Sequence, residues 1–145
     1  MASHRETSRR ALDAYTTGDL TGLEDAYTAD HVIHDTQNPF AAQLHGIDAL
    51  RAQVEMYRAA FPDLVMTTDA QYEDGDVVVS RWTATGTQTG DLPILPATGR
   101  HATVTGMLID RFEGDRIAET WSNWDTPGML QQLGAIPAPQ SAAAS

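Results

Sequence analysis

The chain has 145 residues, 41% of them hydrophobic, and its longest apolar runs fall well short of the ~20 residues that cross a bilayer. Nine Lys and Arg against 20 Asp and Glu give a formal net charge of −11, which argues against binding to nucleic acid or to an anionic membrane surface. The absence of cysteine excludes disulfides, thiolate metal ligands and cysteine nucleophiles.

Length and composition predict one domain over residues 1–136 and a disordered tail over residues 137–145. The tail consists of Ala, Pro, Gln and Ser and has too little apolar mass to pack. The first residues of the chain show no apolar signal segment, so we expect a cytoplasmic location.

Helical spacing of apolar residues marks the first half of the chain. It predicts short helices over residues 5–17 and 20–27, and a longer one from Ile47 to Phe61 that Pro62 ends. Between the second and third helices, residues 31–35 form a short β-like segment. The helices therefore precede most of the strands.

The second half is rich in β-branched and aromatic residues. It predicts four antiparallel strands over residues 64–72, 77–89, 102–112 and 116–124, with acidic glycine turns after the first and third. A proline-rich apolar loop over residues 90–100, which includes Leu95, is expected to overhang a pocket. A last helix is expected from Pro127 to Leu133. The fold class is α+β, with a curved antiparallel sheet wrapped around three N-terminal helices and a short C-terminal helix.

Asp125 lies where the last strand meets the last helix, and is the leading candidate for a catalytic acid. An Asp at this position often caps a helix. Because Pro127 favours the first helical position, we expect Thr126 to be the cap and Asp125 to be free. Strand alternation then places Trp121 and Asn123 on the same face as Asp125. A carboxylate walled by such groups has a raised pKa and suits proton abstraction next to a carbonyl.

His34 and Asp35 are further candidates, at the end of the short β-like segment. His31 and His34 cannot hold one metal ion together, because residues three apart in a strand face opposite sides. His34 alone could donate a hydrogen bond or a proton to a pocket, or it could be a structural histidine.

Other side chains are candidates for substrate binding. Arg81 interrupts an apolar strand, and could reach a substrate carbonyl or form an ion pair. Thr105 and Met107 share one face of the third strand of the meander. Residues on or beside the apolar stripe of the third helix are core side chains or pocket walls: Met56, Tyr57 and Phe61.

No phosphate-binding loop, nucleophile elbow or cluster of metal ligands stands out in the sequence. We therefore expect acid/base chemistry on a small hydrophobic molecule, with no cofactor and no metal.

Four ordered segments resemble a known family. They are Ala60 to Leu64, Arg81 to Gly90, Pro96 to Arg100, and Glu119 to Gly134. Together they resemble the SnoaL-like polyketide cyclases of the nuclear transport factor 2-like superfamily, over residues 5 to 134.

The resemblance implies a cone-shaped α+β barrel with a deep apolar pocket, and a homodimer or higher oligomer that packs through the sheet. It also implies a cofactor-independent cyclase of secondary metabolism, in which Asp125 is the general acid/base of an intramolecular aldol closure. His34, Asn123, Trp121 and Arg81 would then position the substrate or bind the enolate. Relatives of this type also include hydroxylases, epoxide hydrolases and isomerases. A binding protein without turnover is a third alternative.

Overall fold

The computed structural model describes residues 2–137. Four helices and six strands follow one another in the chain: α1 (His4–Thr17), α2 (Leu23–Ala26), β1 (Tyr27–His34), β2 (Gln43–His45), α3 (Gly46–Ala60), β3 (Val65–Asp74), β4 (Val77–Thr87), β5 (His101–Glu113), β6 (Arg116–Trp124) and α4 (Thr126–Gln132).

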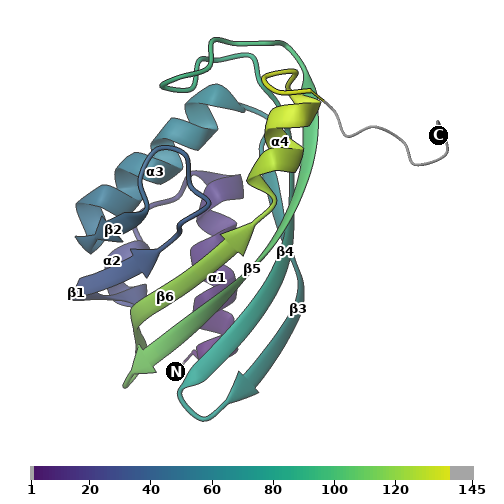
Figure 1. Cartoon of the computed structure of the whole chain (residues 1–145). Helices are drawn as coiled ribbons and strands as arrows, with labels where there is room; N and C mark the ends of the chain where they lie inside the picture. Colours follow the sequence, from purple (N-terminus) through teal and green to yellow (C-terminus); the bar gives the residue numbers. More distant parts are fainter. Residues whose placement is uncertain (1, 138–145) are drawn as a thin grey trace, which may run out of the picture.

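The strands form one curved sheet in the order β2-β1-β6-β5-β4-β3, and the sheet does not close into a barrel (Figure 1). Strands β3 to β6 are an antiparallel meander, as predicted. Strand β1 instead runs parallel to β6, and brings the N-terminal half of the chain beside the last strand. The loop after β1 thereby lies next to the end of β6.

Two tight turns join the strands of the meander. Gly75 has a φ of 62° and Gly114 a φ of 61°, and each is the first residue of a two-residue turn between strands. A positive φ is open to glycine without a steric penalty, and a glycine at this position is typical of hairpins that match the twist of the strands. Both turns were predicted from composition.

Helices α1 and α3 cover the inner face of the sheet. In Figure 1, α1 lies behind the meander and α3 lies to its left. Two apolar clusters fill the space between these layers. One contains Leu50 and Val54 of α3 with Phe112 and Ile117 of the sheet. The other joins Phe61, Trp82 and residues of β5 to α4. A pocket remains between the helices and the sheet.

The predicted α+β class is confirmed, and some details differ from expectation. The second helix is a single turn of four residues, and β1 starts at Tyr27 rather than near residue 31. Strand β2 and its pairing with β1 were not predicted, because three residues carry too little alternation to be recognised. The predicted tail falls, from residue 138 on, outside the described residues.

Candidate active site

An apolar pocket opens between the concave face of the sheet and helices α1 and α3. The space inside it that no atom fills, open solvent at the mouth included, is about 1030 Å³. Aromatic walls come from Phe61, Trp82 and Trp124, and the few polar groups include two carboxylates, Asp35 and Asp110. The pocket therefore combines a hydrophobic surface with acids.

Asp35 follows directly after β1 and is 7% exposed. The indole Nε1 of Trp124 donates to both of its carboxylate oxygens, at 3.1 and 2.9 Å. Burial raises the pKa of Asp35, and hydrogen bonds from Trp124 and from backbone N–H groups partly oppose that rise. The result is a fixed carboxylate, inside an apolar pocket, that takes up a proton more readily than an exposed Asp.

Two phenols lie close to this acid. Tyr15 and Tyr57 line the same pocket, and the charge of Asp35 adds to the burial that raises the pKa of both hydroxyls. Gln53 Nε2 donates to Tyr15 Oη at 2.9 Å. Tyr57 Oη is buried and has no hydrogen-bond partner within residues 2–137. A buried hydroxyl without a partner costs free energy, and a ligand oxygen would satisfy it.

Asp110 lines another part of the pocket and is 2% exposed. Ser8 Oγ donates to one of its oxygens at 2.7 Å and Thr120 Oγ1 to the other at 2.6 Å. Burial raises the pKa of Asp110 to about 6, although both hydroxyl hydrogen bonds oppose the rise. Because hydroxyls already occupy both oxygens, Asp110 is less available to a substrate than Asp35 is.

Gly106 makes room for the two indoles of the pocket wall. Trp82, Gly106 and Trp124 stand opposite one another on β4, β5 and β6. A Cβ on Gly106 would overlap the Trp82 ring and would lie 2.7 Å from Trp124 Cβ. The glycine thus allows the Trp82 ring to lie across β5.

The structure corrects the expectation for Asp125. This residue is exposed, and its Oδ1 accepts a hydrogen bond from the Gly128 N–H at 2.9 Å, so that Asp125 is the N-cap of α4. Thr126, the predicted cap, is buried and donates from Oγ1 to the carbonyl of Gln37 at 2.6 Å. The prediction of Thr126 as the cap was wrong because Pro127 occupies the second helical position and not the first.

The predicted face of the last strand is also wrong. Thr120, Ser122 and Trp124 line the pocket, whereas Trp121 and Asn123 lie on the outer face. Arg81, Thr105 and Met107, which were predicted to bind substrate, are exposed as well. Alternation shows which residues share a face, but it does not show which face meets the helices.

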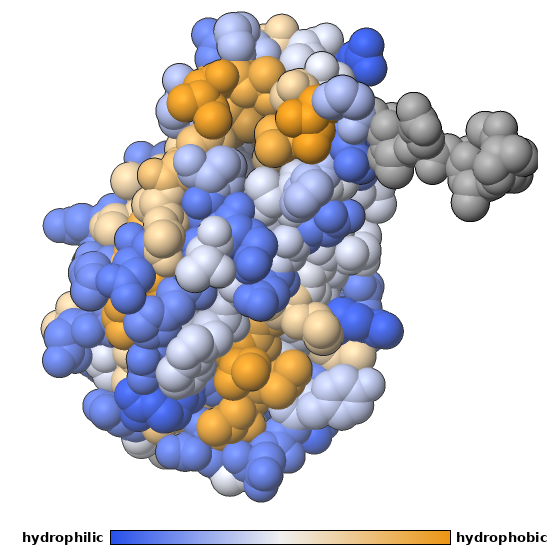
Figure 2. All heavy atoms as spheres, in the orientation of Figure 1, coloured by the Kyte–Doolittle hydropathy of each residue, from blue (hydrophilic) through white to orange (hydrophobic). Residues whose placement is uncertain are grey.

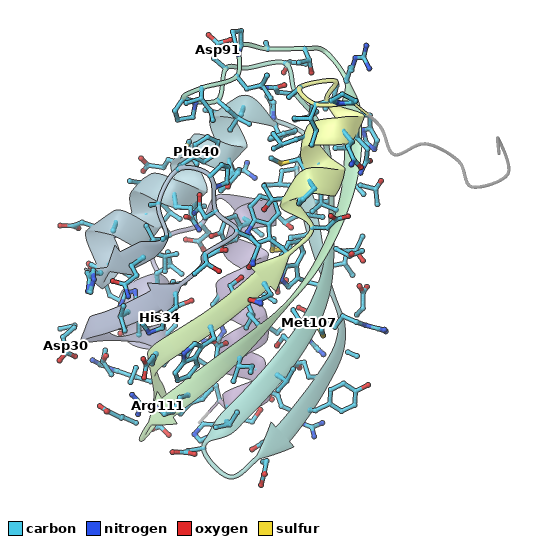
Figure 3. The ribbon with its side chains drawn as sticks, in the orientation of Figure 1. Asp30, His34, Phe40, Asp91, Met107 and Arg111 are labelled. Carbon is cyan, nitrogen blue, oxygen red and sulfur yellow. The ribbon has the colours of Figure 1, made fainter. Side chains whose placement is uncertain are left out.

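His34 lies on this outer face too, where Figure 3 labels it together with Met107 and Arg111. Its Nε2 is 2.7 Å from Glu119 Oε2, and its ring stacks on Trp121 with centroids 5.7 Å apart. Arg111 pairs with the same glutamate. The structure therefore separates His34 from the pocket and from Asp125.

The outer face also carries exposed apolar side chains. Met107 is 54% exposed, Ile109 39% and Trp121 40%, and Figure 2 shows an apolar area over the lower part of the sheet. Such a patch is typical of protein contact surfaces. It agrees with the expected homo-oligomer, which stays a prediction.

Of the residues predicted on or beside α3, Tyr57 and Phe61 line the pocket. Met56 lies outside the lining, and so does Leu95 of the loop over residues 90–100. That loop is held instead by Gln88, a buried residue whose Nε2 donates to the Leu95 carbonyl and whose Oε1 accepts from Thr98.

Sequence reasoning missed Asp110 as a site residue, although a signal was present. On β5, Val104, Leu108 and Phe112 share a face with Asp110, so the acid interrupts an apolar stripe. Asp35 was named as a candidate beside His34, but the approach of Trp124 depends on the parallel pairing of β1 with β6, which local patterns do not show.

Within residues 2–137, no helix is long and apolar enough to cross a membrane. Over the same residues, no three His, Cys, Asp or Glu side chains gather as a metal site would require.

Comparison with known proteins gives consistent matches. The family model described as SnoaL-like polyketide cyclase matches residues 5–133. The aklanonic acid methyl ester cyclase DauD of Streptomyces sp. (strain C5) is 27% identical over 139 residues, which cover 92% of this chain and 83% of DauD.

Two solved structures are also similar to this chain over most of its length. TsrD from Streptomyces laurentii is 30% identical with a TM-score of 0.80, over 91% of this chain and 95% of TsrD. IdmH from Streptomyces antibioticus is 29% identical with a TM-score of 0.76, over 92% of this chain and 99% of IdmH. The chain therefore belongs to the SnoaL-like polyketide cyclase family, within the nuclear transport factor 2-like superfamily.

Proposed function

We propose that this protein is a cyclase that closes a ring within a carbonyl-rich, polyketide-like molecule, by an intramolecular aldol addition that Asp35 catalyses. The observation that carries the proposal is the carboxylate of Asp35 inside an apolar pocket, held by Trp124 Nε1. Membership of the family and the similarity to DauD, a methyl ester cyclase, support this class of reaction.

In the proposed mechanism, Asp35 works first as a base and then as an acid. Its carboxylate removes a proton from a methylene between two carbonyl groups, and the enolate carbon attacks a ketone carbon of the same molecule. A C–C bond forms, and the ketone oxygen takes the proton back from Asp35 and becomes a hydroxyl. The raised pKa of Asp35 suits both transfers, because a group of intermediate acidity can accept and return a proton.

Neutral donors would stabilise the enolate. The hydroxyl of Tyr57 is buried in the pocket lining without a partner in the described chain, and its raised pKa keeps it protonated. A donor that is already in place stabilises developing negative charge without reorganisation.

The pocket favours a planar aromatic substrate over a charged or strongly polar one. Trp82 and Phe61 belong to its aromatic wall, and Phe40 packs on Tyr57 with ring centroids 6.2 Å apart. Figure 3 shows Phe40 on the loop between β1 and β2, beside α3. Ring closure inside such walls excludes water from the enolate.

The test is conversion of aklanonic acid methyl ester and of simpler aryl β-keto esters that carry a further ketone within reach of the methylene, followed by chromatography and mass spectrometry. We expect a product of the same mass as the substrate, because aldol addition moves a proton and loses no atoms. Asp35→Asn should abolish conversion. A product heavier by one water would indicate hydrolysis, as in an epoxide hydrolase, and would overturn the proposal. A failure to convert any of these esters while they bind would favour a binding protein.

A further inference from the structure

A chain of three polar side chains leads from the loop after β1 into the pocket. It begins at Asn38, which is 7% exposed and lies on the loop after β1. Asn38 Oδ1 accepts hydrogen bonds from the backbone N–H of Phe40, at 2.9 Å, and of Ala41, at 3.3 Å. A backbone N–H can only donate, so these contacts fix the oxygen end of the amide. The nitrogen end of Asn38 must then point the other way.

The next link is Gln53 on α3. Asn38 Nδ2 donates to Gln53 Oε1 at 2.9 Å, which fixes the orientation of the second amide. The end of Gln53 that faces Tyr15 is therefore its Nε2, 2.9 Å from Tyr15 Oη. An amide nitrogen donates and does not accept, so the Tyr15 oxygen is the acceptor in this contact.

The last link is the hydroxyl hydrogen of Tyr15. It cannot point at Gln53, and it finds no acceptor in the described part of the chain. Tyr15 and Gln53 both line the pocket, and so does Asp35. Burial raises the pKa of Tyr15 to about 12, so the hydroxyl keeps its hydrogen at neutral pH. A buried donor without an acceptor is free to bind an oxygen of a ligand.

We propose that Asn38 and Gln53 form a one-way hydrogen-bond chain that makes Tyr15 a donor to a carbonyl or enolate oxygen in the pocket. In this account Tyr15 touches the substrate, and Asn38 and Gln53 are positioning residues that act through it. This hydrogen-bond chain selects ligands that carry a hydrogen-bond acceptor beside Asp35. The role of Tyr15 in turnover rests on the proposed function, whereas the direction of the hydrogen bonds does not.

The direction can be reversed with a near-isosteric change. In Asn38→Asp, one carboxylate oxygen keeps the backbone contacts and the other becomes an acceptor that faces Gln53. The Gln53 amide must then turn over and present Oε1 to Tyr15, which captures the Tyr15 hydrogen. Tyr15→Phe removes the same hydrogen directly. In the Phe background Asn38→Asp has nothing left to capture, so any remaining effect of Asn38→Asp reports its added charge.

Binding of two simple probes measures the donor without any turnover. The probes are 1-tetralone, an aromatic ketone, and tetralin, the same ring system without the oxygen. Loss of one hydrogen bond should lower the affinity for tetralone relative to tetralin about tenfold. We expect this loss in Tyr15→Phe and in Asn38→Asp, and no further loss in the double variant. Gln53→Glu, which also accepts from Tyr15, replaces Asn38→Asp if that variant does not fold.

Neutron diffraction from crystals of the deuterated full chain locates the hydrogen itself, with no ligand bound. The inference predicts deuterium on Gln53 Nε2 directed at Tyr15 Oη, and the Tyr15 deuterium directed into the pocket. A Tyr15 deuterium that points at Gln53 would overturn the inference, and so would a tetralone preference that Tyr15→Phe leaves unchanged. Neither measurement depends on Asp35 as a catalyst, so loss of the proposed function would not imitate these results.

Discussion

Trp124 Nε1 donates to both carboxylate oxygens of Asp35, although the two residues are 89 positions apart in the chain. The parallel pairing of β1 with β6 produces this contact, because it places the residue after β1 beside the end of β6. The indole holds the carboxylate in one orientation within the pocket, and its hydrogen bond favours the ionised form. Trp124 therefore forms part of the pocket wall and is also a fixed hydrogen-bond donor to the proposed base.

Gly106→Ala should disturb the pocket wall. The added methyl group would overlap the Trp82 ring and come within 2.7 Å of Trp124 Cβ, so at least one indole must move. We expect a loss of about 1–3 kcal/mol in the free energy of unfolding and weaker binding of aromatic ligands, as is usual when a packed interior is overfilled. Denaturant unfolding measures the change in stability, and ligand titration measures the change in affinity. The matched control is Gly75→Ala, where the added Cβ meets no atom within 4 Å, although its φ of 62° brings backbone strain. Gly75→Ala should therefore lower stability and leave ligand affinity unchanged.

Tyr57→Phe should separate stability from activity. The hydroxyl has no partner within residues 2–137, so its removal relieves a buried polar group and should leave the free energy of unfolding unchanged or raise it by up to about 1 kcal/mol. If the hydroxyl donates to the enolate, ring closure should slow roughly tenfold or more. Thermal unfolding and turnover of the same preparation test the two effects. A variant that is both less stable and fully active would contradict this role.

Asp110 should make stability depend on pH in the direction opposite to that of a salt-bridged acid. Burial raises its pKa in the folded chain to about 6, above its value in the unfolded chain, so the folded state binds the proton more tightly. Stability is then highest below the unfolded pKa, and falls as pH rises toward and through about 6. The difference of about two pKa units corresponds to roughly 3 kcal/mol.

Asp110→Asn, measured by urea unfolding between pH 4 and 8, should remove this fall and be more stable than the native chain at pH 8. Ser8 and Thr120 can still hydrogen-bond to the amide, because hydroxyls donate or accept. If the free energy of unfolding changes with pH in the same way in both proteins, the pKa of Asp110 is not raised by folding.

Asp125 should behave as a helix cap. Asp125→Ala removes the acceptor of the Gly128 N–H, and we expect it to cost about 1 kcal/mol of stability. Asp125→Ser keeps an acceptor at the same place and should stay within a few tenths of a kcal/mol of the native chain. Denaturant unfolding of both variants measures these two changes in stability. Equal stability of the alanine and serine variants would argue against the capping role.

The fold was largely predictable from local patterns, since the helix from Ile47, the four strands of the meander and both glycine turns are set by nearby residues. The parallel pairing of β1 with β6 was not, because it joins segments about 90 residues apart through backbone contacts that leave no local pattern.

The site was less predictable, for a physical reason. Alternation on β6 separates Trp121 and Asn123 from Ser122 and Trp124, but both sets contain an indole and a small polar side chain. The inner face is decided by what packs against it, here α1 and α3. Asp110, in contrast, interrupts an apolar stripe of β5, and a search for acids within such stripes would have found it.

The assignment of Asp35 as the base is tested most directly by a comparison of Asp35→Asn with Asp125→Asn. Two rates are measured: exchange of the substrate's activated methylene hydrogens for solvent deuterium, and ring closure. Both changes remove one carboxylate, but one lies in the pocket and the other caps α4. We expect Asp35→Asn to slow enzyme-dependent exchange and closure by at least about 100-fold, and Asp125→Asn to keep both rates within a few fold of the native protein. Loss in Asp125→Asn with normal rates in Asp35→Asn would contradict the assignment of Asp35 as the base.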